Sequence, residues 1–332
     1  MKISIVLLVK NGLKYLPKLI SELGKQSGGF EIELIVVDSG STDGSWEFIK
    51  SLKEKKFKSL KLYKINPKEF GHGKTRNLAV AKCSAEIVVF LSQDALPISN
   101  SWLVLLIKPL LLKRHSGESR EAGRLQNRFW TSPSTPSLST PSSRPRGSGP
   151  RGQNDKNKIA GVFGRQIPYQ KTNLCETFFY RESYPDKRRV MGREDSDKFS
   201  NQNLFFSNVN AAARKDLLLK YPFREDLIMS EDQYWGREVL KNGYQIVYEP
   251  KAAVYHSHNY NLFELGKRYF KIGFSQKQMG LKGDPMVKGA STFFGLLKYI
   301  FSQKPWLLPY AIIYGLVKGG AYFIGRHLYN NF

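Results

Sequence analysis

The stretch Glu86-Ile-Val-Val-Phe-Leu-Ser-Gln-Asp-Ala95 decides the fold. Its unbroken run of large apolar residues, from Ile87 to Leu91, predicts a central β-strand that is buried on both faces. The run stops at Gln93 and Asp94, so a carboxylate stands at the carboxyl end of the strand. In open α/β sheets the ligand crevice lies just outside such ends, which makes Asp94 a candidate contact for a ligand or a metal. The alternative role for this acid is to cap the next helix.

Apolar and helical segments alternate before this strand. Apolar runs are found at residues 3–9, 31–37 and 61–65, and helical patterns follow them at residues 15–23, 45–55 and 71–83. The second run ends at another acid, Asp38. Because the loops are short, the alternation predicts an α/β fold, with a Rossmann-like, mainly parallel sheet flanked by helices. A further helix is expected at residues 101–113.

A sharp change of composition interrupts this pattern. Residues 114–157 are rich in Ser, Pro, Arg and Gly, which predicts a disordered insertion. Beyond it, strands are expected at 159–166, 207–213, 244–248 and 253–255, and helices at 214–220 and 230–241, the last with Ser230 as its N-cap. We therefore divide the chain into two halves of one α/β domain, at residues 1–112 and 159–259. An insertion at residues 113–158 separates them, and a helical tail follows at residues 260–332.

The composition bounds the partners of the protein. The 332 residues suffice for one large α/β domain with a tail, and the two cysteines, Cys83 and Cys175, imply no disulfide framework and fit a reducing cytoplasm. The formal charge is +24, and much of it lies in two segments: residues 113–158 carry ten basic residues against three acids, and residues 260–332 carry ten against two. A tail that is both basic and aromatic predicts contact with an anionic membrane surface.

Nucleic acid is the alternative partner for so basic a chain. No helix-turn-helix, zinc-finger or RNA-binding signature accompanies the charge, so no nucleic acid is expected. Residues 307–324 are apolar but contain Lys318, a proline and several glycines, which favours an interfacial helix or hairpin over a membrane span. We therefore expect a cytoplasmic protein that lies peripherally on the inner face of the cell membrane.

Residues Gly71 to Asn77 form a glycine-bearing basic loop that opens a helix. Gly73-Lys74-Thr75 ends like a P-loop, but Lys68 stands where that motif needs its first glycine, so a P-loop-like nucleotide-dependent enzyme is only an alternative. Backbone N–H groups at a helix N-terminus, the helix dipole and Arg76 all favour an anion such as a diphosphate. A simple turn is the other interpretation.

Several acids and histidines have a structural and a chemical interpretation. Glu231 and Asp232 begin a predicted helix, where the helix dipole favours acids, but one of them can instead deprotonate an attacking hydroxyl. Asp38 is either a turn acid or an acceptor for the imide N–H of a pyrimidine. His256 and His258 lie two residues apart on a predicted strand and point to the same face, which is weak evidence for a metal.

Taken in order, these motifs resemble those of family 2 glycosyltransferases of the GT-A fold, and most of all their bacterial rhamnosyltransferase-like branch. The motifs are Val37-Asp-Ser-Gly-Ser-Thr-Asp-Gly-Ser45, Gly73-Lys-Thr-Arg-Asn77, Ser92-Gln-Asp-Ala95, Ser230-Glu-Asp232 and His256-Ser-His258. The resemblance covers about residues 1–280 apart from the insertion. It implies an inverting transfer of a sugar, L-rhamnose from dTDP-rhamnose, from a nucleotide-sugar donor to a lipid-linked or cell-surface glycan.

The resemblance also implies roles for particular residues. Asp232 is expected to be the general base, and Glu231 to orient the acceptor or the base. A divalent cation, Mn or Mg, is expected at Asp94 with His256 as a further ligand, and His258 ranks below it. Donor binding is assigned to Asp38, Ser39, Asp43, His72, Lys74, Arg76, Asn77, Gln93 and Asp94. The first half of the domain, residues 1–112, would bind the nucleotide sugar, and residues 159–259 the acceptor.

One departure from the family pattern concerns the metal. The family's Asp-x-Asp motif has two carboxylates, whereas Gln93-Asp94-Ala95 has one. The sequence therefore predicts a metal site that is poorer in carboxylates than is usual for the family.

Overall fold

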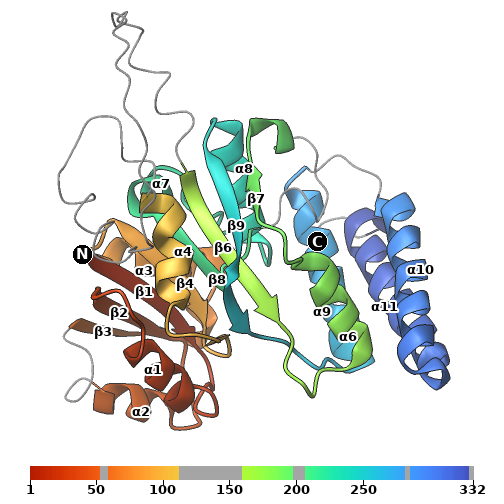
Figure 1. Ribbon diagram of the computed structural model, residues 1–332, viewed down its shortest axis with the longest axis horizontal. Helices are drawn as coiled ribbons and strands as arrows, with labels where there is room; N and C mark the ends of the chain where they lie inside the picture. Colours follow the sequence, from red (N-terminus) through yellow and green to blue (C-terminus); the bar gives the residue numbers. More distant parts are fainter. Residues whose placement is uncertain (53–58, 112–158, 197–205, 281–284, 329–332) are drawn as a thin grey trace, which may run out of the picture.

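A computed structural model describes residues 1–52, 59–111, 159–196, 206–280 and 285–328 (Figure 1). The predicted insertion at 113–158 lies outside the described residues. The strands are β1 (Lys2–Val9), β2 (Glu31–Asp38), β3 (Ser59–Lys64), β4 (Ile87–Ser92), β5 (Leu96–Pro97), β6 (Ile159–Ile167), β7 (Arg189–Met191), β8 (Asn210–Arg214) and β9 (Gln245–Tyr255). The α-helices are α1 (Leu16–Gly24), α2 (Ser45–Ser51), α3 (His72–Lys82), α4 (Trp102–Leu111), α6 (Leu174–Ser183), α7 (Lys215–Lys220), α8 (Glu231–Lys241), α9 (Leu262–Gln278), α10 (Pro285–Gln303) and α11 (Leu308–Phe323).

One mixed sheet organises the described residues. Its strand order is β3-β2-β1-β4-β8-β6-β9-β5, and β7 pairs with β9. The first four strands are parallel, as predicted, whereas β8 runs antiparallel to both β4 and β6. Strand β4, which contains the apolar run from Ile87 to Leu91, is thus paired on both sides. Since β1, β2 and β4 end at the same edge of the sheet, the residues that follow them are brought close together.

Helices cover both faces of the sheet. Helices α1 and α4 pack on one face, where Trp102 of α4 is fully buried in the apolar cluster that covers this face. Helices α3, α7 and α8 cover the other face around a fully buried Trp235. Helix α4 is largely apolar and lies over β6, β8 and β9. These two layers explain why the central strands carry apolar residues at every position rather than at alternate ones.

The C-terminal helices form a third packed group at one side of the sheet (Figure 1). Helix α11 contacts α9 and α10, and α10 contacts α6, around a cluster that includes the buried residues Leu265, Leu296 and Tyr314. The predicted helical tail is therefore present, but part of it packs against the domain. Helix α6 and strand β7 had no counterpart in the predicted elements.

One predicted feature is wrong, and a second is confirmed in position only. The two strands expected at 244–248 and 253–255 are one strand, β9, whose register on β6 shifts between Gly164 and Gln166. Pro250 interrupts the sequence pattern there, but the strand continues past it because the irregularity leaves its missing N–H outside the ladder. Ser230 does precede α8, but its side chain makes no cap hydrogen bond, since its backbone is left-handed with a φ of 65°.

Candidate active site

A cavity of 1610 Å³ opens at the carboxyl ends of β1 and β4. It extends from the ends of these strands, past the start of α8, to helices α6, α9, α10 and α11. Pockets for one small ligand usually measure about 300–1000 Å³, so this cavity has room for more than one substrate. Nine of the predicted site residues line it: Ser39, His72, Arg76, Gln93, Asp94, Glu231, Asp232, His256 and His258.

One group in the cavity consists of Asp94, His256 and His258. The Nε2 atom of His256 lies 3.6 Å from Oδ1 of Asp94, and Nε2 of His258 lies 3.8 Å from Oδ2. The three ligand atoms all lie within 4.8 Å of one another. The cause is local. Strand β5 begins two residues after Asp94 and pairs antiparallel with the end of β9, and His256 is the residue that follows β9. His258 lies as near to Asp94 as His256 does, although the sequence ranked it lower.

The His256 ring is held in a fixed orientation. It is buried, and its Nδ1 lies 2.8 Å from Oε1 of Gln166, whose Nε2 donates to Ser207 Oγ at 3.1 Å. This contact leaves Nε2 facing Asp94. Burial lowers the pKa of His256 to about 4 and also lowers the pKa of His258, so both rings are neutral at pH 7. Neutral imidazole is the form that binds metals.

The donor set fits a divalent cation. Two imidazole nitrogens and one carboxylate form a recurrent set of protein ligands that leaves several coordination positions open. Gln166 supports this set from behind, as partners of metal-binding histidines commonly do. We did not predict Gln166 from the sequence. The available signal was a polar residue at the end of an otherwise apolar predicted strand.

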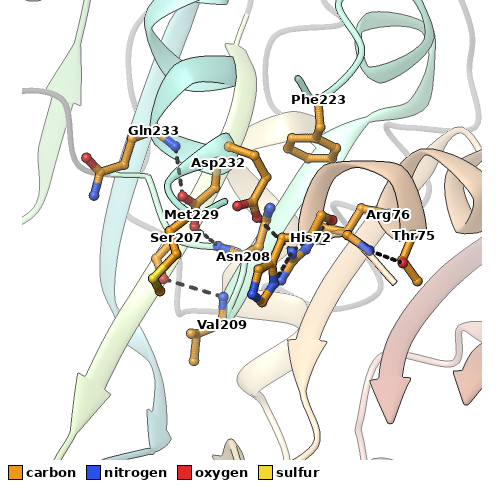
Figure 2. Close-up of polar contacts among 12 residues, drawn as sticks. His72, Thr75, Arg76, Ser207, Asn208, Val209, Phe223, Met229, Asp232 and Gln233 are labelled. Atoms are coloured by element: carbon orange, nitrogen blue, oxygen red, sulfur yellow. Dashed lines mark hydrogen bonds and ion pairs between the residues drawn. The ribbon is translucent and has the colours of Figure 1, made fainter. Parts of the chain in front are cut away.

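A second group consists of Glu231 and Asp232 at the first turn of α8. The Nη1 atom of Arg76 donates to Oε1 of Glu231 at 2.7 Å, and both side chains are mostly buried. The Asp232 carboxylate accepts from the backbone N–H of Asn208 at 3.1 Å and from that of Gln233 at 2.9 Å (Figure 2). Burial and the charge of Glu231 raise the pKa of Asp232 to about 7. A carboxylate of this kind can take a proton from a hydroxyl group at neutral pH.

Asn208 is a further residue of this group that sequence reasoning missed. It lines the cavity beside Asp232, and the residue is only 2% exposed (Figure 2). Neither its Oδ1 nor its Nδ2 has a hydrogen-bond partner among the described residues. Buried amides are normally paired, so this amide is available to polar groups of a bound ligand. No local pattern singles it out within Ser207-Asn208-Val209-Asn210.

Asp38 and Asp43, the two acids predicted to bind the donor beside Asp94, differ in how many of their oxygen atoms accept hydrogen bonds. Asp38 is fully buried next to Ser39; its Oδ1 accepts from the N–H groups of Gly40 and Ser41, each at 2.9 Å. Its Oδ2 has no partner among the described residues. Asp43 instead accepts from Leu13 N–H at 3.0 Å and from Ser45, whose hydroxyl lowers the pKa of Asp43. Asp43 therefore fastens two loops together and does not line the cavity.

Helix α3 presents only part of its predicted set to the cavity. His72 and Arg76 line it, and burial lowers the pKa of His72, whereas Lys74 and Asn77 lie outside the lining. The Asn77 side chain donates to Phe223 O at 2.9 Å and accepts from Phe223 N–H at 3.0 Å. Asn77 thus holds the loop before α8. Its role in donor binding stays a prediction.

Three other residues at or near the cavity have structural contacts. A Cβ on Gly73 would lie 2.2 Å from the carbonyl oxygen of Arg224, so this glycine permits a close approach of two backbones. This packing contact explains why position 73 is a glycine, and no bound phosphate is needed to explain it. Gln93 accepts from Lys10 N–H at 3.0 Å and donates to Lys10 O at 3.0 Å, which ties the end of β4 to the end of β1. Ser39 Oγ donates to Val9 O at 3.1 Å.

Residues 4–218 match the family model described as glycosyl transferase family 2. The chain belongs to this family. The match confirms the predicted family and the predicted enzyme class, which is a nucleotide-sugar glycosyltransferase. The predicted α/β fold is also confirmed. The P-loop-like enzyme and the nucleic-acid-binding protein were the alternatives, and family membership favours neither. The roles of the individual site residues stay predictions.

Curated relatives cover most of the chain. The O-antigen chain rhamnosyltransferase RfbN of Salmonella typhimurium is 27% identical over 98% of this chain and 90% of its own length. The O-antigen chain rhamnosyltransferase WbaN of Salmonella anatum is 25% identical over 89% of this chain and 80% of its own. These two relatives support a rhamnosyltransferase-like member of the family.

Solved structures share the fold at low identity. The mannosyltransferase PcManGT of Pyrobaculum calidifontis, in complex with GDP-Man and Mn²⁺, has a TM-score of 0.52 and 14% identity, and the match covers 96% of this chain and 75% of that one. Staphylococcus aureus TarS has a TM-score of 0.52 and 15% identity, with 100% and 56% coverage. At these identities the likeness shows the fold, which is that of GT-A glycosyltransferases.

Proposed function

We propose that this glycosyltransferase transfers L-rhamnose from dTDP-rhamnose, with inversion, to a lipid-linked or cell-surface glycan. The observation that carries the proposal is that one cavity holds both the Glu231 and Asp232 pair and the group of Asp94, His256 and His258. The first suits deprotonation of an acceptor, and the second suits neutralisation of a leaving diphosphate. The two Salmonella relatives, named as O-antigen chain rhamnosyltransferases, support the choice of sugar.

The nucleotide is proposed to contact Asp38. The unpaired, buried Oδ2 of Asp38 can accept the imide N–H of thymine or uracil, while Oδ1 keeps the loop in place. His72 and the backbone N–H groups at the start of α3 favour the anionic diphosphate. Gln93 keeps the ends of β1 and β4 together beneath the donor.

The reaction is a single displacement. The oxygen of the acceptor hydroxyl attacks the anomeric carbon and transfers its proton to Asp232. As the new C–O bond forms, the bond to the diphosphate oxygen breaks and its electron pair leaves with the nucleoside diphosphate, which inverts the anomeric centre. A divalent cation held by Asp94, His256 and His258 would neutralise the charge on that leaving group. Arg76 fixes Glu231, and Asn208 holds the Asp232 carboxylate through its N–H.

An affinity panel of nucleoside diphosphates tests the donor assignment. We expect dTDP and UDP to bind more tightly than CDP, because N3 of cytosine is an acceptor that Asp38 cannot bind. Asp38→Asn places an NH₂ group at this position, so we expect at least a tenfold loss for dTDP, equivalent to about 1.4 kcal/mol, and a gain for CDP relative to dTDP. Equal binding of all pyrimidine and purine nucleoside diphosphates would contradict the role of Asp38. Transfer only from a donor other than dTDP-rhamnose would contradict the assignment of L-rhamnose as the transferred sugar.

Membrane association is proposed from the C-terminal helices. Large apolar side chains are exposed there, among them Phe294, Phe301 and Trp306, which are 67%, 65% and 71% exposed. Within the described residues, one helical stretch, Pro305–His327, is long and apolar enough to cross a membrane, and only 11% of it is buried. By itself one such helix is weak evidence, but basic residues on the same tail favour an anionic surface. We place this surface on the cytoplasmic face of the membrane.

Sedimentation with lipid vesicles tests this location. We expect the protein to bind vesicles that contain anionic lipid, and to bind neutral vesicles less. The double variant Phe301→Ser and Trp306→Ser is expected to weaken vesicle binding at least tenfold, because both side chains are exposed and their loss creates no cavity. Tighter binding to duplex DNA than to anionic vesicles at physiological salt would contradict the proposal.

A further inference from the structure

The cavity continues beyond the catalytic groups toward the C-terminal helices. We call this part the distal branch, and it lies between α6, α9, α10 and α11, lined by Phe179, Arg268, Thr292, Lys318, Gly319 and Tyr322. The mechanism above uses none of these residues. The branch is continuous with the part of the cavity that holds Asp94 and Asp232. A ligand that occupies it would therefore extend from the reacting groups toward the C-terminal helices.

Two basic side chains in the distal branch pack against aromatic rings. Nζ of Lys318 lies 2.8 Å from the centroid of the Phe179 ring and 4.6 Å from that of Tyr269. The guanidinium of Arg268 stands 5.4 Å from the Tyr260 ring centroid. Within the described part of the chain, neither forms an ion pair. Burial lowers the pKa of Lys318 to about 7, while the charge of Glu176 raises it, so a further anion bound beside the ammonium group would favour its charged form.

Two carboxylates line the same branch, and among the described residues neither forms an ion pair with Lys318 or Arg268. Glu176 is buried and accepts a hydrogen bond from the Tyr314 hydroxyl. Glu182 lies on the exposed side of α6. A third cation, Arg326, also lines the branch and donates to Gln276 and Tyr322. The chemistry of the branch therefore favours an anionic group.

Glycines keep the branch open between α10 and α11. A Cβ on Gly315 would lie 2.5 Å from the Phe293 ring, so that glycine permits helix packing. A Cβ on Gly319 or Gly320 would meet nothing within 4 Å. Glycine in a helix interior costs about 1 kcal/mol relative to alanine, and packing does not account for it at these two positions. Both glycines line the cavity and are exposed, so the space beside them is open to solvent and to a ligand.

The branch also reaches the apolar outer surface. Leu316 and Phe323 line the cavity and are nevertheless 62% and 39% exposed. The branch therefore combines an apolar opening with cations at its inner part. This pairing matches an amphiphile with an anionic head and a hydrocarbon chain.

We propose that the distal branch binds the phosphate groups and the first part of the hydrocarbon chain of the lipid carrier of the acceptor. Lys318 and Arg268 contact the phosphates, and the hydrocarbon chain leaves past Gly319 and Gly320 toward the membrane. The inference rests on the proposed function in one respect, since it takes the acceptor to be lipid-linked. It adds the place at which the carrier binds.

Binding of farnesyl diphosphate to the full-length protein tests the proposal. Titrations are made with dTDP present at saturation, so that the probe cannot occupy the donor site. We expect farnesyl diphosphate to bind at least tenfold more tightly than either farnesol or inorganic diphosphate. Gly319→Leu, which fills the open space, and Lys318→Met, which removes the charge, are each expected to weaken it at least tenfold.

Matched controls separate the branch from general surface effects. Gly24→Leu also adds a side chain where nothing lies within 4 Å, and Lys298→Met removes an exposed charge from α10; neither should change binding of the probe. All variants should keep the affinity of the wild type for dTDP, which shows that they are folded. Unchanged binding in Gly319→Leu or in Lys318→Met, or farnesol binding as tightly as the diphosphate, would overturn the inference. Loss of dTDP binding by the wild type would instead overturn the proposed function.

Discussion

Asp232→Asn is expected to lower kcat by about 10²- to 10⁴-fold while the affinity for dTDP stays unchanged, because a general base typically contributes that factor. The asparagine keeps an oxygen for the N–H of Asn208 but cannot take a proton. Steady-state release of dTDP in the presence of acceptor measures the rate, and calorimetry measures the affinity. Asp216→Asn is a matched control, since the Asp216 side chain is 59% exposed and is paired with Arg214. More than a tenth of wild-type kcat in Asp232→Asn would show that another group is the base.

The pH dependence of the wild type provides a second check on the same residue. A base must be unprotonated to act, and the pKa of Asp232 is raised to about 7. Activity is therefore lost as the pH falls through about 7. In Glu231→Gln, removal of the neighbouring negative charge lowers the pKa of Asp232, so the acid limb moves to lower pH. An acid limb that stays in place in this variant would contradict the coupling of the two acids.

Much of the architecture followed from the sequence, for a definite physical reason. Apolar runs such as Ile87 to Leu91 mark buried strands because their side chains face helices on both sides of the sheet. Periodicity does not encode strand direction, so the antiparallel placement of β8 was not predicted. It also did not reveal β5, which is two residues long but brings Asp94 beside His256.

The candidate site was predicted in outline but not in its supporting residues. The acids and histidines stand at element ends, where sequence position alone places them near the carboxyl edge of the sheet. Gln166 and Asn208 gain their roles from residues distant in the sequence, His256 and Asp232, and no local pattern reports such contacts. The same holds for Arg268, which reaches the cavity only because α9 packs against the domain.

Asp94→Ala is expected to lower transfer by about 10²- to 10³-fold and to remove the response to added Mn²⁺. The Asp94 carboxylate is the one acid in the cluster with His256 and His258. A cation at a leaving diphosphate is worth several kcal/mol, and each 1.36 kcal/mol corresponds to a factor of ten in rate. Transfer rates with EDTA, Mn²⁺ or Mg²⁺, together with the Mn²⁺ affinity from electron paramagnetic resonance, measure both effects. Asp186→Ala, with a side chain that is 83% exposed, serves as the control.

The choice of metal follows from the same donor set. Two of the three ligand atoms are imidazole nitrogens, which Mg²⁺ binds less readily than transition metals do, so we expect Mn²⁺ to support transfer at lower concentration than Mg²⁺. His258→Ala should then weaken Mn²⁺ binding about as much as His256→Ala, because both nitrogens lie at similar distances from Asp94. Gln166→Ala should weaken it about 10- to 100-fold through the orientation of His256. Full activity of Asp94→Ala in EDTA would mean that cationic side chains alone neutralise the leaving group.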